Sequence, residues 1–347
     1  MKKRFALCLL VFTALSAKSW AQAPNRSFRT LQLGFSPREA ALGGRVTAIE
    51  DSDLNLALFT PSLASQRLHN HLSFNYLNFL GDINGGQIGY AYALKDKPYV
   101  ITGGIRYFNY GEFGATNEFF QQTGTFQANE ILLQGGITWV LDSNLRAGGQ
   151  VKWVQSSLES YRSSAVMADF SMTYYNEKRL FGATVMVSNA GAILQDYAGL
   201  EGRLPFDLSV GLSKKLARSP LRFSLVADQL TQWDLSYTDP STAGQLDPLT
   251  GQISAPERPG FGDRLFRHIY GGTELVFSKN FHIRFGYNYR RRQELKIDAR
   301  PRGSGISYGF GMRIKRFEFS YARAIYHLAG SSHHFSITTN LATFGKK

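Results

Sequence analysis

Hydrophobic and polar positions alternate with a period of two along most of this chain. In Phe281 to Arg290, which reads FHIRFGYNYR, the odd-numbered side chains are apolar or aromatic and the even-numbered ones are polar, basic or glycine. Such alternation predicts a β-strand with one apolar and one polar face. In a soluble sandwich the apolar face would meet a core, whereas in a membrane barrel it would meet lipid and the polar face would line the lumen.

Fourteen segments follow this pattern, and each has the length of about ten residues that a tilted membrane-crossing strand needs. They begin near Leu72, Gln87, Tyr99, Phe126, Leu145, Ala165, Leu180, Pro205, Leu221, Leu265, Phe281, Gly305, Phe317 and His333. Their polar faces consist mostly of Gly, Ser, Ala and Gln. The pattern predicts an all-β fold, a transmembrane antiparallel β-barrel of about fourteen strands.

The links between these segments alternate in length. Short links such as Lys95 to Pro98 and Asp142 to Asn144 take turns with long ones such as Gly111 to Thr125, Arg291 to Ser304 and the longest, residues 234–264. Short periplasmic turns and long extracellular loops are typical of outer-membrane barrels. An even strand number would leave both chain ends on the periplasmic side.

The chain opens with a basic start and a short apolar run, MKKRFALCLLVFTALSAKSWAQA. The apolar run, Phe5 to Ala17, is too short to cross a bilayer. It predicts a secretory signal peptide over residues 1–21, cleaved after Ala21 or alternatively after Ala23. The only cysteine, Cys8, lies in this signal, so the mature chain would hold no disulfide and no thiolate metal site.

Charge and composition narrow the class further. The formal charge of +13 becomes +9 without Lys2, Lys3, Arg4 and Lys18 of the signal. An exported basic protein is expected to meet anionic lipid or lipopolysaccharide and no nucleic acid. After the signal no apolar run reaches the roughly 18 residues of a membrane helix, which excludes a helical membrane protein. A Gram-negative outer-membrane location follows.

Residues 22–70 precede the first strand and have neither a period of two nor a long helical stripe. Their centre, Ser36 to Leu63, reads SPREAALGGRVTAIEDSDLNLALFTPSL. Irregular backbone at membrane depth is tolerated only inside protein or a watery cavity, and a fourteen-stranded lumen is wide enough to hold it. We expect residues 22–70 to plug a barrel formed by residues 71–347; the alternative is a periplasmic cap beside the barrel.

This segment resembles the N-terminal hatch of the FadL-like barrels. Those hatches carry an Ala- and Gly-rich element, then an acidic pair, then an Asn-Pro-Ala-like turn. The matching residues here are Ala40, Ala41, Leu42, Gly43, Gly44, Asp51, Asp53 and Pro61. The turn departs from the family pattern, since Thr60 replaces Asn and Ser62 replaces Ala.

Two further stretches resemble the PorQ members of the PorV/PorQ group of these barrels, which serve the type IX secretion system. They are LSFNYLNFLGDINGGQIGYAYAL from Leu72 and LPFDLSVGLSKKLARSPLRFSLVADQLTQWDLSY from Leu204. The resemblance covers most of the mature chain and is weakest over residues 234–264. It implies a non-enzymatic anchor for the cell-surface attachment complex that joins secreted cargo to lipopolysaccharide, with PorZ-like, PorU-like and PorV-like partners.

The rival interpretation is a FadL-like outer-membrane transporter of a hydrophobic small molecule. A polar, filled lumen favours the anchor, and a continuous apolar tunnel favours transport. No nucleophile elbow, zinc helix or phosphate loop is found, so neither an enzyme nor a cofactor is expected. The paired histidines His69 with His71 and His333 with His334 lack the carboxylates and spacing of a metal site.

Candidate surface contacts lie in two predicted loops. The first reads NYRRRQELKIDARPR from Asn288, and its arginine forks match phosphate well. The candidate anion or partner contacts there are Arg290, Arg291, Arg292, Arg300 and Arg302. The alternative is a solvated loop with no specific ligand. The second loop, residues 234–264, is the first choice for docking a partner, or else is disordered.

Overall fold

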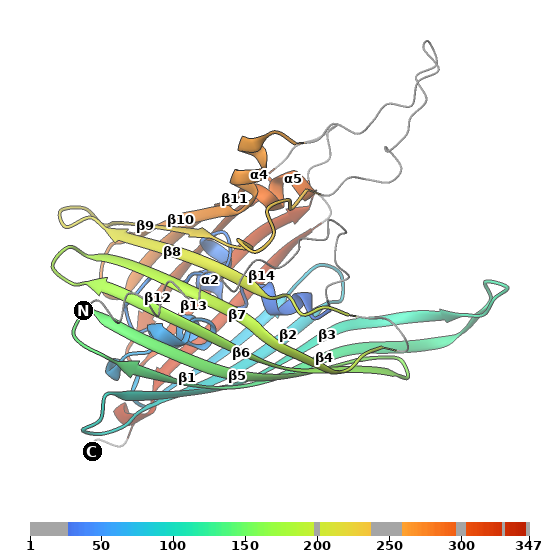
Figure 1. Cartoon of the computed structure of the whole chain (residues 1–347), viewed down its shortest axis with the longest axis horizontal. Coiled ribbons are helices and arrows are strands. Elements are labelled where there is room, and N and C mark those ends of the chain that lie inside the picture. Colours follow the sequence, from blue (N-terminus) through green and yellow to red (C-terminus); the bar gives the residue numbers. More distant parts are fainter. Residues whose placement is uncertain (1–26, 198–201, 237–258, 296–302, 328–329, 345–347) are drawn as a thin grey trace, which may run out of the picture.

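The structure, a computed structural model, describes residues 27–197, 202–236, 259–295, 303–327 and 330–344. These residues form fourteen antiparallel strands, each paired with its neighbours in sequence, and β1 pairs with β14 to close the barrel (Figure 1). The strands are β1 His71–Asn78, β2 Asn84–Ala93, β3 Tyr99–Thr116, β4 Gln122–Val140, β5 Leu145–Leu158, β6 Tyr161–Asn176, β7 Phe181–Gln195, β8 Asp207–Lys215, β9 Leu221–Ala227, β10 Ile269–Val276, β11 Phe281–Asn288, β12 Ile306–Ile314, β13 Phe317–His327 and β14 Gly330–Asn340. The predicted fold class is confirmed.

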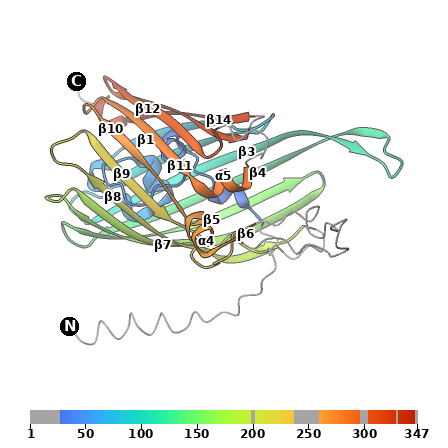
Figure 2. The same ribbon diagram turned by 90° about the horizontal axis from the view of Figure 1, so that it is seen from above.

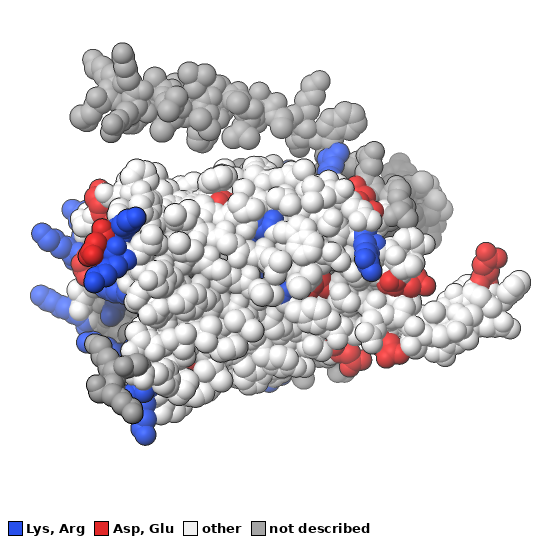
Figure 3. All heavy atoms as spheres, turned by 90° about the horizontal axis from the view of Figure 1, so that it is seen from below, with Lys and Arg blue, Asp and Glu red and all other residues white. Residues whose placement is uncertain are grey.

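The alternation along each strand separates lipid-facing from lumen-facing side chains. On β11, Phe285 is 51% exposed on the outer wall, while Arg284 is 2% exposed inside. On the face seen in Figure 3, a white belt with few charged groups covers the barrel, and lysines and arginines gather at the end that carries the short turns. This is the arrangement that a barrel in lipid needs, with the apolar face outward.

The barrel wall is uneven in height. The prediction of a loop from Gly111 to Thr125 was wrong over most of that range. There β3 and β4 continue as a hairpin that projects beyond the rest of the barrel (Figures 1 and 2). Phe113 and Phe126 stack across it, with ring centroids 5.4 Å apart. The strand expected from Leu265 begins only at Ile269, because helix α4, Phe261–Arg267, precedes it.

Residues 27–70 form short helices inside the barrel (Figures 1 and 2). They are η1 Arg29–Gln32, α2 Pro37–Ala41, α3 Leu54–Phe59, η2 Pro61–Leu63 and η3 Gln66–Leu68. The first turn of α2 is fixed by a capping box: the Ser36 hydroxyl accepts from the Glu39 amide, and the Glu39 carboxylate accepts from the Ser36 amide. Asp53 caps α3 with a single hydrogen bond, in which its carboxylate accepts from the Asn55 amide. We call residues 27–70 the hatch.

The hatch contacts the wall on every side. Asn55 crosses the seam between the first and last strands: its amide nitrogen donates to Ser336 of β14, and its oxygen accepts from Asn75 of β1. On the opposite wall the Ser62 amide donates to Ser171 of β6. The remaining strands meet the hatch through Ala93, Arg106, Gln134, Arg146, Met186, Ser213, Arg222, Glu274, Asn288, Ser307 and Ala322. Each of the fourteen strands therefore touches the hatch.

Among the described residues, no helix combines the length and the apolar character needed to cross a bilayer. Two short helices, α4 and α5 (Tyr289–Leu295), lie at the loop end of β10 and β11 (Figure 1). A short turn, η4 (Leu341–Thr343), follows β14. The predicted signal peptide falls in residues 1–26 and the centre of the longest predicted loop in residues 237–258, outside the described part of the chain.

Candidate functional site

A cluster of buried charges joins the hatch to β9, β10 and β11. Arg38, on α2, places one terminal nitrogen 2.6 Å from Asp51 and 2.8 Å from Glu274 of β10, and its other terminal nitrogen lies 3.1 Å from Asp53. Arg38 is 6% exposed and Glu274 is 1% exposed. Since ion pairs so deep lose almost all contact with water, they persist only when the charges and hydrogen bonds are well matched.

Two wall arginines complete this cluster. Arg222 of β9 lies 2.5 Å from Asp51 and 3.0 Å from Glu274, and the Nε of Arg284 on β11 lies 2.9 Å from Glu274. Three guanidinium groups thus balance three carboxylates. Burial alone would raise the pKa of Asp51, but Arg38 and Arg222 outweigh it and hold that pKa well below its ordinary value. We call these six residues the hatch lock.

A second charge cluster lies toward the loop end. Arg45 of the hatch is 2% exposed and lies 2.6 Å from Asp207 of β8 and 3.4 Å from Asp228, just after β9. Asp228 also binds Arg290 of α5 at 3.0 Å. Burial opposes the charge of Arg290, yet Asp228 raises its pKa above the ordinary value. This cluster ties the hatch, the wall and helix α5 together.

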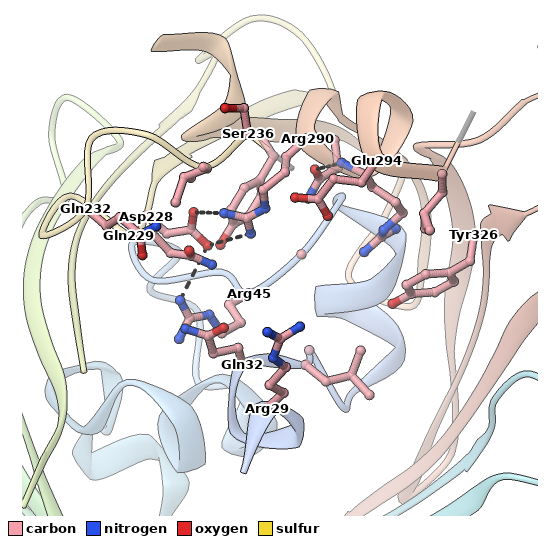
Figure 4. A pocket seen from close by; sticks show the side chains of 18 of the residues that line it. Arg29, Gln32, Arg45, Asp228, Gln229, Gln232, Ser236, Arg290, Glu294 and Tyr326 are labelled. Atoms are coloured by element: carbon pink, nitrogen blue, oxygen red, sulfur yellow. Dashed lines mark hydrogen bonds and ion pairs between the residues drawn. The ribbon is translucent and has the colours of Figure 1, made fainter. Parts of the chain in front are cut away.

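Above this second cluster lies a polar cavity of about 700 Å³ (Figure 4). Its floor is the hatch and its wall is the barrel rim, which is low here because β9, β10 and β11 are short. Figure 4 shows Arg29 and Arg45 reaching in from the hatch and Arg290 from α5. The charged lining residues are Arg29, Arg45, Asp228, Arg290, Arg291 and Glu294. We call it the loop-end cavity.

The predicted hatch residues serve packing and pairing. Ala40 and Ala41 pack on Ala322 of β13, and Leu42 joins an apolar cluster with Val46 and Leu56. Asp51 and Asp53 both bind Arg38, as described above. The glycine pair and the proline are packed against the wall as follows: Gly43 against the Tyr287 backbone, Gly44 against the Tyr270 ring and Pro61 against Gly148. Gly43 has φ of +94°, which favours glycine.

The three predicted surface arginines that the structure describes do not form one exposed patch. Arg290 turns inward to Asp228, and the Arg291 guanidinium lies 4.1 Å from the centre of the Tyr326 ring. Arg292 follows on the same helix, half-buried beside Gly305. Arg300 and Arg302 lie outside the described residues. Helix α5 also replaces the first part of the loop that was predicted from Arg291 to Ser304.

The histidines make ordinary structural contacts. The Nδ1 of His334 lies 3.0 Å from the Phe35 carbonyl of the hatch, and the Nδ1 of His69 lies 2.9 Å from the Ala93 carbonyl. Within the described ranges, no group of three or more His, Cys, Asp or Glu side chains is placed to hold a metal ion.

The sequence interpretation missed most of the charged residues that join the hatch to the wall. Arg38, Arg45, Arg222, Glu274 and Arg284 were not identified. A signal was present for the wall members, since an ionisable residue on the lumen face of a membrane strand is costly unless it is paired.

No protein-family model matches this chain, and no curated protein does. Among solved structures, the CymD monoaromatic hydrocarbon channel is similar, with 12% identity, 90% of this chain and 97% of that chain covered, and a TM-score of 0.50. The Pseudomonas putida toluene transporter TodX aligns at 13% identity over 91% of this chain and 98% of its own, with a TM-score of 0.48. A Pseudomonas aeruginosa FadL homologue aligns at 10% identity over 92% and 99%, with a TM-score of 0.44. At such identities the likeness concerns the fold: this chain has the FadL-like fold of an outer-membrane β-barrel.

Proposed function

We propose that this protein is a non-enzymatic surface anchor of the type IX secretion system, which holds PorZ-like, PorU-like and PorV-like partners of the attachment complex at the outer membrane. One observation carries the proposal: the hatch inside the barrel is ion-paired to the wall through buried charges. The sequence resemblance of the hatch and of the stretches from Leu72 and Leu204 supports the secretion system in particular.

The energetics argue against a hatch that moves in each working cycle. Removing one partner from a buried ion pair costs about 3–5 kcal/mol. A shift of the hatch would separate Arg38 from Glu274 and Arg45 from Asp207 together, and would leave charges unpaired at membrane depth. A barrel with a fixed plug suits a protein that holds others rather than one that passes a solute.

A tethered hatch tests this role directly. The hydroxyl oxygens of Ser62 in the hatch and Thr173 in β6 lie 2.7 Å apart, so Ser62→Cys with Thr173→Cys is placed to form a disulfide across the hatch–wall boundary. The control pair, Ser52→Cys with Ser65→Cys, joins two hatch residues whose hydroxyl oxygens are 3.2 Å apart. Both pairs should leave surface attachment of cargo and recovery of PorZ-like or PorU-like partners unchanged.

Loss of cargo attachment in the wall-tethered variant alone would overturn the fixed-plug proposal. Failure to recover any attachment-complex protein with the unmodified barrel from solubilised outer membrane would overturn the secretion role.

A second candidate function is transport of a hydrophobic compound. The observation that favours it is an apolar groove of about 970 Å³ on the outer wall, with Gly271 among its lining residues. The groove is lined by Leu212, Phe223, Leu225, Phe266, Phe285 and Tyr287. The similar fold of a monoaromatic hydrocarbon channel agrees with it. Uptake of toluene into vesicles that stops when Ser62 and Thr173 are cross-linked would favour this candidate.

A further inference from the structure

The apolar groove on the outer wall follows β10, whose outward-facing side chains are small. Gly271 and Thr273 face lipid, because Tyr270 and Glu274 at the alternate positions are buried inside the barrel. The residues that lie opposite the small pair on β9 and β11 are Leu225, Tyr287, Phe223 and Phe285. The groove, of about 970 Å³, therefore lies over β10 between two rows of larger apolar side chains.

An aromatic pair bounds the groove at its loop end. Phe266 of α4 and Tyr289 of α5 both line it, and their ring centroids are 6.0 Å apart. The Tyr289 hydroxyl donates to Asp263 at 2.8 Å, and the Nε of Arg267 lies 2.6 Å from the same carboxylate. These contacts hold the two helices together beyond the ends of β10 and β11 (Figure 1).

The other end of the groove reaches the short turns and carries a cation. Lys214 lies next to the last residue of β8, opposite Phe223, and its side chain is exposed. It is the only charged residue among those that line the groove. Its ammonium donates to the Arg179 carbonyl, which takes one of three N–H donors.

The position of the groove gives the class of its occupant. It lies on the wall that faces lipid, so a hydrocarbon chain fills it rather than water. The aromatic pair stands at the loop end and Lys214 at the turn end, so a chain would enter from the periplasmic leaflet with an anionic phosphate beside the lysine. Phospholipid forms that leaflet, whereas lipopolysaccharide lies in the outer one.

We propose that the groove binds one acyl chain of a phospholipid from the periplasmic leaflet, with its phosphate at Lys214 and its chain end beside Phe266 and Tyr289. The site does not depend on the anchor role, because its lining involves no secretion partner. It competes with the transport candidate, since a transported compound would need the same space.

The full-length barrel, purified in mild detergent, is examined by native mass spectrometry. Phospholipid should remain bound after purification. The delipidated barrel is then titrated with palmitoyl-oleoyl phosphatidylglycerol, with glycerol 3-phosphate, which has a phosphate but no chain, and with lipopolysaccharide. Phosphatidylglycerol should bind, glycerol 3-phosphate should not, and lipopolysaccharide should not displace the phospholipid.

Two pairs of variants locate the site. Thr273→Phe fills the groove and should weaken phosphatidylglycerol binding about tenfold, which corresponds to about two buried methylene groups. Its control, Val151→Phe, enlarges a side chain of β5 that is 59% exposed and outside the groove. Lys214→Gln should weaken binding about fivefold. Its control, Lys178→Gln, removes an exposed lysine of the neighbouring turn. Both controls should bind as the unmodified barrel does.

Heat-modifiable migration on gels checks that each variant is folded. Equal weakening by Thr273→Phe and Val151→Phe would indicate unspecific lipid around the barrel and overturns the proposal. Unchanged affinity in folded Thr273→Phe overturns it as well. Displacement of phosphatidylglycerol by lipopolysaccharide, or unchanged affinity in Lys214→Gln, would contradict the assignment to the periplasmic leaflet.

Discussion

At the scale of single residues, Glu274 is the carboxylate on which the hatch lock depends. It accepts from Arg38 of the hatch and from Arg222 and Arg284 of the neighbouring strands. It therefore joins two wall arginines to one hatch arginine. Without its charge, three guanidinium groups would share only Asp51 and Asp53 in a site almost closed to water.

Glu274→Gln should lower the free energy of unfolding by about 3–5 kcal/mol, because it leaves buried positive charge without its partner. Urea unfolding of the barrel in lipid vesicles measures the loss. The control is Glu318→Gln, whose carboxylate is 31% exposed and pairs with Arg313 near a turn. That variant should lose about 0–1 kcal/mol. Equal losses in the two variants would contradict the importance of the hatch lock.

The lowered pKa of Asp51 predicts a dependence on acid. Because its folded-state pKa lies below its unfolded value near 3.8, its stabilising effect is full above that value and is lost as the pH falls below it. Asp51→Asn should reduce the loss of stability between about pH 5 and about pH 2. Urea unfolding across this range measures the difference.

Burial raises the pKa of Glu39 and of Asp53, so their protonation favours the folded state as the pH falls, which is opposite to the effect of Asp51. Only the comparison with Asp51→Asn therefore isolates the contribution of Asp51. Identical pH profiles for the two proteins would refute the predicted role of the ion pair.

The residues of the hatch lock could be predicted only in part. Arg284 falls on the polar face of FHIRFGYNYR, so its position in the lumen follows from alternation. Its partner does not, because Glu274 lies opposite Arg284 only through the register of β10 on β11. The hatch partner depends on a tertiary fit that no local pattern encodes. Likewise, the sequence shows the arginines after Asn288, but it does not show that Arg290 binds Asp228 while Arg291 packs on the Tyr326 ring.

At the scale of elements, wall glycines set how closely the hatch approaches. Gly286 of β11 lies against the backbone of Leu42 and Gly43, so a Cβ there would overlap main-chain atoms of the hatch. In contrast, Gly135 of β4 has no atom within 4 Å of the position where a Cβ would lie. Two glycines in similar strands thus have different roles.

Gly286→Ala should destabilise the barrel by about 1–3 kcal/mol and make the hatch more sensitive to trypsin, since main-chain atoms cannot yield as a flexible side chain can. Gly135→Ala should stay within about 0.5 kcal/mol. Limited proteolysis of both variants in vesicles, together with urea unfolding, provides the comparison. A hatch that is equally protected in both would argue against this tight approach.

Some elements could be predicted and others could not. The letters SPRE carry the capping-box signature, so the start of α2 was available from sequence although the segment was treated as irregular. The extension of β3 and β4 past Gly111 was not, because glycines interrupt the alternation there while cross-strand pairs such as Phe113 with Phe126 maintain the hairpin.

At the scale of the whole molecule, strand number, pairing order and closure followed from period-two alternation and from unequal links. These features are repeated fourteen times, so a local error at Leu265 did not change the topology. The loop-end cavity had no such repeated signal. It arises where the low rim of β9 to β11, the hatch and α5 meet, and their meeting depends on the closed barrel.

The contact of Asn55 with both β1 and β14 has a consequence for assembly. One hatch side chain bridges the two strands whose pairing completes the ring, so the hatch can act as a template that selects their register. The hatch precedes every strand in the sequence, yet its contact with β14 can form only after the last strand has joined the barrel. Closure of the barrel and docking of the hatch then become a single cooperative event, and a partly assembled barrel would be neither closed nor plugged.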